Sequence, residues 1–304
     1  MLPAIVRVSH LINPSPLPHS GRRLPLPSAD CARYDTLFLC DLRNPKYLVT
    51  GISPLSRMER FFTGSSINKN KKMVEQLQHY GVIKSKKVAE VMETIDRALF
   101  VPDGTPPYVD SPMPIGYNAT ISAPHMHATC LDLLEQNLQP GMHALDVGSG
   151  TGYLTACFSM MVGPQGRAVG VEHISELAAD SIKNIEKSAA APFLKEGSLS
   201  IHVGDGRLGW PDAAPYDAIH VGAAAPEIPQ PLLDQLKPGG RMVIPVGNIF
   251  QDLKVVDKNP DGSIKVRSET SVRYVPLTSR DAAAWLLNQA CCSSPLPVTP
   301  RPDC

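Results

Sequence analysis

Hydrophobic residues in the second half of the chain follow two alternating spacings, and this alternation predicts the fold. Short apolar runs, typical of buried strands, lie at 143–147, 167–171, 199–203, 216–221 and 241–246. Segments with apolar residues three or four positions apart, typical of helices, lie between them at 152–162, 175–188 and 229–236. Strands that alternate with helices in this way form a doubly wound, mostly parallel α/β sheet.

The segments after residue 250 predict a different arrangement at the edge of that sheet. Residues 251–257, 263–267 and 271–276 have strand character, with no long helix between them. Asp261-Gly262 is a hairpin-type turn between the first two. We therefore expect an antiparallel C-terminal edge on the parallel sheet.

Three helices are predicted upstream of the sheet. Order is expected to begin near Lys71, with a short helix that Gly81 ends. Ser85 is a candidate N-cap for a second helix, whose apolar positions continue at helical spacing to Leu99. The third helix is expected from about residue 124 to residue 137.

The distribution of proline limits the folded domain. The chain has 304 residues and 30 prolines. Residues 1–66 and 291–304 are rich in proline without sustained periodicity, so both are expected to be disordered. The folded domain is expected over residues 67–290.

Composition excludes several function classes. The 29 basic and 29 acidic residues balance, so no overall field favours nucleic acid or an anionic membrane. No apolar run approaches the ~18 residues of a membrane helix. The seven cysteines form no C-x-x-C pair, so we expect neither a disulfide framework nor a metal site. A reducing, cytoplasmic location is the expectation.

The chemistry is concentrated in a glycine-rich turn after the first strand, Ala144-Leu-Asp-Val-Gly-Ser-Gly-Thr-Gly152. Glycines let a ligand approach the backbone, and the following helix start adds free N–H groups. A dinucleotide fingerprint would need glycine where the chain has Tyr153, which disfavours a nicotinamide oxidoreductase. The pattern that begins at Asp146 instead resembles the nucleotide-binding turn of S-adenosylmethionine-dependent methyltransferases. A tight structural connection remains an alternative for the turn alone.

Acidic residues follow the next two strands. Glu172 ends the second strand, where its carboxylate could accept both hydroxyls of a ribose. Its alternative role is a charge at a helix N-terminus. Asp205 follows the third strand and could hold an adenine amino group, although alone it fits an ordinary turn residue. His220, within the fourth strand, is expected to be a hydrogen-bonded core histidine.

A hydroxyl-bearing segment precedes the third helix. Thr120 and Ser122 lie near the predicted helix N-terminus, where they could bind a carboxylate, and His125 and His127 could add donors. Ser122 could equally be a simple N-cap before Pro124. The residues themselves leave both possibilities open.

Five segments in order resemble the protein-L-isoaspartate O-methyltransferase family, over about residues 73 to 278. These segments are Ile115-Gly-Tyr-Asn-Ala-Thr-Ile-Ser-Ala-Pro-His-Met-His127, the glycine turn, Val203-Gly-Asp-Gly-Arg207, Tyr216-Asp-Ala-Ile-His-Val-Gly-Ala-Ala-Ala-Pro226 and Tyr274-Val-Pro-Leu-Thr278. The run Ala119-Thr-Ile-Ser-Ala-Pro-His is the most specific of them.

The resemblance implies a Rossmann-like repair enzyme. It would methylate the free α-carboxylate of L-isoaspartyl and D-aspartyl residues in damaged proteins and peptides, with S-adenosylmethionine as cofactor. The enzyme would be a cytoplasmic monomer. The implied catalytic residue is Ser122, and Thr120, Ile121 and His127 would position substrate or cofactor. The implied cofactor-binding residues are Ala119, Asp146, Val147, Gly148, Ser149, Gly150, Glu172, His173, Asp205, Gly206 and Thr278.

Two other functions remain possible at this point. A non-catalytic adaptor of the same fold would need an added interaction module, and only a possible short helix at 281–288 and a tail follow Thr278. A small-molecule methyltransferase would fit the sheet motifs but would leave the T-I-S-A-P-H run unexplained. The chain also departs from the family at 245–251 and after Thr278.

Overall fold

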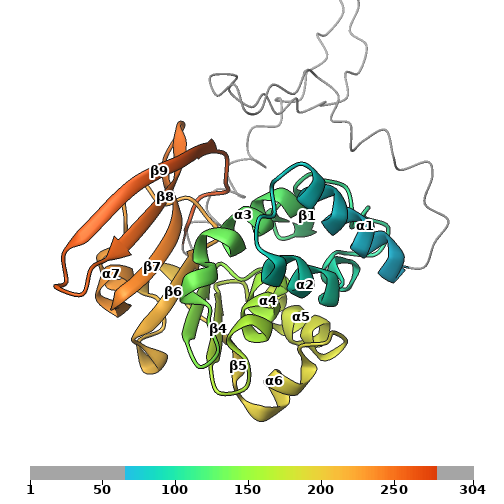
Figure 1. The fold of residues 1–304 in the computed structure, drawn as a ribbon, viewed down its shortest axis with the longest axis horizontal. Helices are drawn as coiled ribbons and strands as arrows, with labels where there is room; N and C mark the ends of the chain where they lie inside the picture. Colours follow the sequence, from blue (N-terminus) through green and yellow to red (C-terminus); the bar gives the residue numbers. More distant parts are fainter. Residues whose placement is uncertain (1–65, 279–304) are drawn as a thin grey trace, which may run out of the picture. The chain divides into compact units, whose positions relative to one another are not determined.

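A seven-stranded sheet forms the centre of the protein in a computed structural model, which describes residues 66–278 (Figure 1). Its strand order is β5-β4-β3-β6-β7-β8-β9. The bounds are β3 (His143–Val147), β4 (Arg167–Glu172), β5 (Leu199–Val203), β6 (Tyr216–Val221), β7 (Leu236–Gly247), β8 (Gln251–Lys258) and β9 (Ile264–Val272). The first five strands in this order are parallel, and β8 and β9 are antiparallel. This confirms the predicted fold class.

Helices and short turns connect these strands. The α-helices are α1 (Ser66–His79), α2 (Lys86–Thr94), α3 (Pro124–Leu134), α4 (Tyr153–Val162), α5 (Ser175–Glu186), α6 (Ala191–Glu196) and α7 (Gln230–Gln235). The 3-10 turns are η4 (Arg97–Phe100), η5 (Glu135–Asn137), η6 (Gly206–Leu208) and η7 (Pro211–Ala213). A separate hairpin pairs β1 (Met113–Gly116) with β2 (Ala119–Ile121).

Residues of the central parallel strands β3, β4 and β6 enter two different hydrophobic clusters. On β3, Ala144 belongs to the cluster that α1 to α5 cover, whereas Leu145 belongs to the cluster beside Leu232 of α7. Because both faces are covered, these strands are apolar at nearly every position, which is why short apolar runs predicted them. The arrangement leaves the carboxyl ends of β3, β4 and β6 at one common edge.

The helix N-cap and the hairpin turn predicted from the sequence are confirmed. The Ser85 hydroxyl accepts a hydrogen bond from the Val88 N–H at 3.3 Å, as an N-cap does. The Gly262 N–H donates to the Asn259 carbonyl in the turn between β8 and β9. Cys130 and Cys157 are free and buried.

Two predicted helix limits were wrong. The first helix begins at Ser66, before the expected start near Lys71. The second helix ends at Thr94 instead of continuing to Leu99, because the backbone of Ile95 is extended and a 3-10 turn follows. Ile95 and Leu99 still pack in the core, so their spacing alone indicated a continuous helix.

Three details of the second half also differ from the sequence-based prediction. The predicted strands 263–267 and 271–276 form one strand, β9, that ends at Val272. Helix α6 was not predicted. The strand expected at 241–246 begins earlier, because β7 starts at Leu236, and its pairing with β6 shifts before Arg241.

Some predictions concern parts of the chain outside the described residues. These are the disorder expected at 291–304, the possible helix at 281–288, and the extension at 1–66, of which only Ser66 is described. Within the described part, no helix is both long and apolar enough to cross a bilayer.

Candidate functional site

A turn with three left-handed glycines follows β3. Gly148, Gly150 and Gly152 have φ angles of 71°, 54° and 88°, a region in which other residues are strained. The N–H groups of Gly148 and Ser149 both donate to the Val171 carbonyl, which fixes the turn against β4. Helix α4 begins directly afterwards, so its N-terminus points its free N–H groups toward this edge of the sheet.

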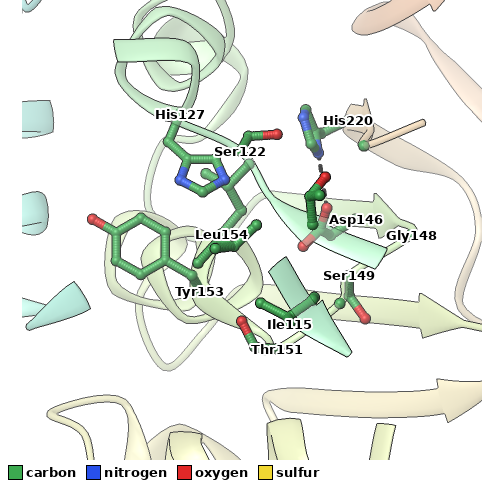
Figure 2. A pocket seen from close by; sticks show the side chains of 14 residues that line it. Ile115, Ser122, His127, Asp146, Gly148, Ser149, Thr151, Tyr153, Leu154 and His220 are labelled. Atoms are coloured by element: carbon green, nitrogen blue, oxygen red, sulfur yellow. Dashed lines mark hydrogen bonds and ion pairs between the residues drawn. The ribbon is translucent and has the colours of Figure 1, made fainter. Parts of the chain in front are cut away.

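The β1–β2 hairpin covers this turn. Its loop residues Tyr117 and Asn118 have positive φ angles of 53° and 58°, as two-residue hairpin turns require. A Cβ on Gly150 would lie 3.3 Å from Cδ1 of Ile115 on β1, so glycine permits this close approach. The hairpin thereby brings the segment from Thr120 to Ser122 next to the glycine turn (Figure 2).

The two segments line one pocket, which Figure 2 shows from close by. Eight predicted site residues lie in its wall: Thr120, Ile121, Ser122, His127, Asp146, Gly148, Ser149 and Gly150. The other lining residues are Ile115, Thr151, Tyr153, Leu154, His220 and Gly222. Residues from three separate parts of the sequence therefore meet at the carboxyl ends of β3 and β6.

Two hydroxyl groups in the pocket wall have no partner. Within the described residues, the side-chain oxygens of Ser149 and Thr151 are buried and make no hydrogen bond. A buried polar group without a partner costs about 1–3 kcal/mol. Their common position in one pocket fits a bound polar ligand such as a nucleoside.

Asp146 lies beneath the turn and is fully engaged with the protein. Its carboxylate accepts from the Thr155 hydroxyl at 2.6 Å, and its other oxygen lies 2.8 Å from Nδ1 of His220. Burial lowers the pKa of His220, but hydrogen bonds to Asp146 and Cys130 raise it overall to about 10. His220 is therefore a hydrogen-bonded core histidine, as predicted, although it also reaches the pocket wall.

Ser122 does not cap the helix that follows it. Ala123 occupies the N-cap position of α3, and no side chain makes a capping hydrogen bond there. The capping alternative for Ser122 is therefore wrong. The Ser122 side chain lies beside the Tyr274 hydroxyl. Burial raises the pKa of Tyr274 well above its usual value, and the hydrogen bond with Ser122 opposes part of this increase. On β2, Thr120 is exposed and Ile121 is buried.

The two candidate histidines differ in their surroundings. His125 is bound to Asp110, with 2.8 Å between Nδ1 and the carboxylate, and it does not line the pocket. His127 is buried in the pocket wall, with its Nδ1 3.0 Å from Nη1 of Arg97. Burial and the charge of Arg97 lower the pKa of His127 well below its usual value, so its imidazole is neutral.

Glu172 is tied to the turn from the neighbouring strand. Its two oxygens accept the Gly150 N–H at 2.9 Å and the Ile174 N–H at 3.0 Å. His173 adds an Nδ1 contact of 3.0 Å to the same carboxylate. Ile174 is the N-cap residue of α5, so the alternative role at a helix start is also fulfilled.

The remaining predicted residues lie outside the pocket wall. Asp205 pairs with Arg207 at 2.6 Å, and this hydrogen bond lowers the pKa of Asp205. Gly206 packs against Val147, whose side chain belongs to the cluster on the other face of the sheet. Near Thr278, the Leu277 N–H donates to the Ala224 carbonyl beyond β6. Ala119 pairs with Gly116 in the hairpin.

Comparisons with known proteins identify the family of this chain. Residues 68–282 match the family model "Protein-L-isoaspartate(D-aspartate) O-methyltransferase (PCMT)". A protein-L-isoaspartate O-methyltransferase of Triticum aestivum is 74% identical over 225 residues, which cover 74% of this chain and 98% of that protein. The corresponding enzyme 1 of Arabidopsis thaliana is 72% identical with the same coverage. The chain belongs to the protein-L-isoaspartate O-methyltransferase family.

A solved structure supports the family assignment. A Plasmodium falciparum protein of the same named family, in complex with S-adenosyl-L-homocysteine, is 32% identical and superposes with a TM-score of 0.64. The match covers 69% of this chain and 99% of that one. The family and the enzyme class predicted from the sequence are thus confirmed.

Sequence reasoning missed three residues of this family member's site. Arg97 was overlooked because it lies in a segment predicted as an amphipathic helix, where a charge usually faces solvent. Tyr153 was used only to exclude a dinucleotide fingerprint, yet its ring packs against His127. Thr155 was treated as part of a helix face. A basic residue between apolar positions was the one available signal for Arg97.

Proposed function

We propose that this chain methylates the free α-carboxylate of L-isoaspartyl and D-aspartyl residues in damaged proteins, with S-adenosylmethionine as methyl donor. Family membership supports this activity over both alternatives, the adaptor and the small-molecule methyltransferase. The single observation that carries the proposal is the pocket that joins Ser122 to the glycine turn. A donor at the turn and an acceptor at Ser122 would be neighbours.

The chemistry needs positioning more than proton transfer. An aspartyl-type carboxylate has a pKa near 4 and is already ionised at neutral pH, so no general base is required. S-adenosylmethionine supplies a methyl group that its sulfonium sulfur already activates. The hydroxyls of Ser122 and Thr120 hold the carboxylate oxygen, and the rate gain comes from proximity and alignment.

We assign the cofactor contacts to the residues predicted from the sequence. Three residues of the glycine turn line the pocket: Gly148, Ser149 and Gly150. The Ser149 hydroxyl is buried without a hydrogen-bond partner, which supports ligand binding there. Glu172 accepts one backbone N–H on each oxygen and also lies 3.0 Å from Nδ1 of His173. A carboxylate offers about four lone pairs, so it can still accept one ribose hydroxyl. Asp205 would accept from the adenine amino group.

The rest of the predicted set is retained on the same proposal. Ile121 and His127 position substrate or cofactor. Ala119, Asp146, Val147, His173, Gly206 and Thr278 complete the cofactor contacts. Asp146 acts by holding the turn, since both of its oxygens already have partners within the protein.

A methyl-transfer assay with labelled cofactor tests the activity. An isoaspartyl peptide is compared with the same peptide that contains normal aspartate, and only the former should become labelled. If cofactor binds and neither peptide is labelled, the proposed activity is wrong and the adaptor is favoured.

Replacement of Ser122 tests its assigned role. Ser122→Ala should lower kcat about 10²-fold, the scale expected when a reactant is misaligned, and should keep the affinity for S-adenosylhomocysteine. Ser263→Ala, in the exposed turn between β8 and β9, is the matched control and should keep full activity. Full activity of Ser122→Ala would remove Ser122 from the mechanism.

We also propose a cytoplasmic monomer with one methyltransferase domain at about residues 67–290. The buried free thiols of Cys130 and Cys157 support a reducing compartment. Light scattering after size exclusion tests the oligomeric state, and imaging of a tagged chain tests the location. Limited proteolysis with mass spectrometry tests the domain limits.

A further inference from the structure

A fully buried arginine lies behind the pocket wall. Arg97 has no solvent exposure, and none of the described carboxylates forms an ion pair with it. Burying a charge is costly unless hydrogen bonds compensate it. Two such contacts are present: Nη2 donates to the Ser122 carbonyl at 2.7 Å, and Nη1 lies 3.0 Å from Nδ1 of His127.

The chemistry of the guanidinium determines the direction of the second hydrogen bond. Arginine has five N–H donors and no acceptor, so Nδ1 of His127 must be the acceptor. A neutral imidazole that accepts at Nδ1 carries its proton on Nε2. Within the described residues, Nε2 has no hydrogen-bond partner, and His127 lines the pocket (Figure 2).

The surroundings of His127 keep it in this state. The ring packs against Tyr153, with 5.0 Å between ring centroids. The charges that act on the imidazole are those of Arg97, His220 and His125, and each of them lowers the pKa of His127; Tyr153 is a further titratable group packed against the ring. No carboxylate is among them to favour the protonated form.

We propose that Arg97 is a positioning residue: it anchors Ser122 by its carbonyl and fixes His127 as the Nε2–H tautomer, which donates to the substrate carboxylate. Arg97 itself touches neither substrate nor cofactor. The role in catalysis rests on the proposed methyl transfer, whereas the tautomer of His127 does not depend on it.

A purely structural role for Arg97 is the competing explanation. Its guanidinium lies 5.6 Å from the centre of the Tyr153 ring, a cation–π contact that could stabilise the fold by itself. In that case, loss of Arg97 would reduce stability but would leave the His127 tautomer and kcat unchanged in the folded fraction.

Nitrogen-15 NMR of the full chain with bound S-adenosylhomocysteine tests the tautomer directly. The His127 signals are assigned by their loss in His127→Gln. The wild type should show the Nε2–H tautomer and no titration from pH 5 to pH 8. An Nδ1–H tautomer, or protonation within this range, would overturn the proposal even if no Arg97 variant folds.

Arg97→Met then separates positioning from structure. It should mix the two His127 tautomers and lower kcat at least tenfold, with the Kd for S-adenosylhomocysteine changed less than twofold. Arg241→Met is the matched control, because Arg241 also donates to a backbone carbonyl, that of Leu133 at 2.9 Å, outside the pocket wall. That control should leave both kcat and the tautomer unchanged. If Arg97→Met keeps a pure Nε2–H tautomer, or kcat within twofold of wild type, the proposal fails.

A double-mutant cycle isolates the His127 part. The amide of His127→Gln can donate from near the Nε2 position whether or not Arg97 is present. The loss of kcat caused by Arg97→Met should therefore be at least threefold smaller in the His127→Gln background than in the wild type. Equal losses in both backgrounds would refute the tautomer role.

Failure of the proposed function can be distinguished from failure of this proposal. If the wild type methylates no isoaspartyl peptide, the proposed function fails. The NMR experiment still shows whether Arg97 holds His127 as the Nε2–H tautomer.

Discussion

The buried pair of Asp146 and His220 predicts an unusual dependence of stability on pH. Both side chains are almost fully buried, and 2.8 Å separates Nδ1 of His220 from the Asp146 carboxylate. Burial opposes protonation of His220, but the hydrogen bonds to Asp146 and Cys130 raise its pKa from 6.5 to about 10. The folded protein should therefore keep the proton on His220 at neutral pH, whereas the unfolded chain releases it.

The sign and size follow from linkage. A histidine with a raised pKa in the fold stabilises the protein fully below about pH 6.5, and this contribution is lost as the pH rises toward about 10. Between these values the loss is about 1.4 kcal/mol for each pH unit. From pH 7 to pH 9 the free energy of unfolding should thus fall by about 2–3 kcal/mol through this group.

Urea unfolding at pH 7, 8 and 9 measures this contribution. His220→Gln removes the titrating group and should be less stable than the wild type at pH 7. From pH 7 to pH 9, however, its free energy of unfolding should fall by about 2–3 kcal/mol less than that of the wild type. Asp146→Asn should flatten the wild-type slope as well, because it removes the carboxylate that favours protonated His220. Equal slopes for wild type and His220→Gln would show that His220 is neutral in the fold and would refute the reasoning.

Three further predictions concern the frame of the site. Gly206→Ala should weaken the binding of S-adenosylhomocysteine measured by calorimetry, because the added Cβ would lie 2.5 Å from Cγ1 of Val147. Gly204→Ala is the control, because its added Cβ would make only ordinary contacts at 3.5 Å. Ser85→Ala should lower the free energy of unfolding by about 1 kcal/mol in urea, since it removes the N-cap of α2, and an unchanged midpoint would contradict the cap. Phe250→Ser should leave the Tm within about 2 °C in calorimetry, because Phe250 is 91% exposed, and a larger drop would mean that its ring is covered.

Local spacing in the sequence predicted most of the fold, and the family resemblance predicted eight of the residues that line the pocket. Parallel strands covered on both faces need apolar residues at nearly every position, so short apolar runs located β3 to β6. The glycine turn was readable because only glycine tolerates its backbone angles without strain. The T-I-S-A-P-H run indicated where an acceptor carboxylate would bind.

Where a helix or strand ends was less predictable. The apolar spacing from Val88 to Leu99 continued past the true end of α2, because Ile95 and Leu99 pack against the core although neither lies in an α-helix. The two expected strands after Gly262 are one strand because pairing with β8 runs from Ile264 to Val272, across the gap between the two segments. Spacing records which residues are buried, but the neighbouring strand decides how far the pairing runs.

Only the tertiary structure decided the partners of the buried polar groups. Arg97 lies 25 and 30 residues before Ser122 and His127 in the sequence, and Asp146 lies 74 residues before His220. Nothing in the local pattern pairs such residues, because separate helices and strands must first pack together to bring them within hydrogen-bond distance. The sequence thus indicated which groups are candidates for the chemistry, and packing determined which buried groups contact them.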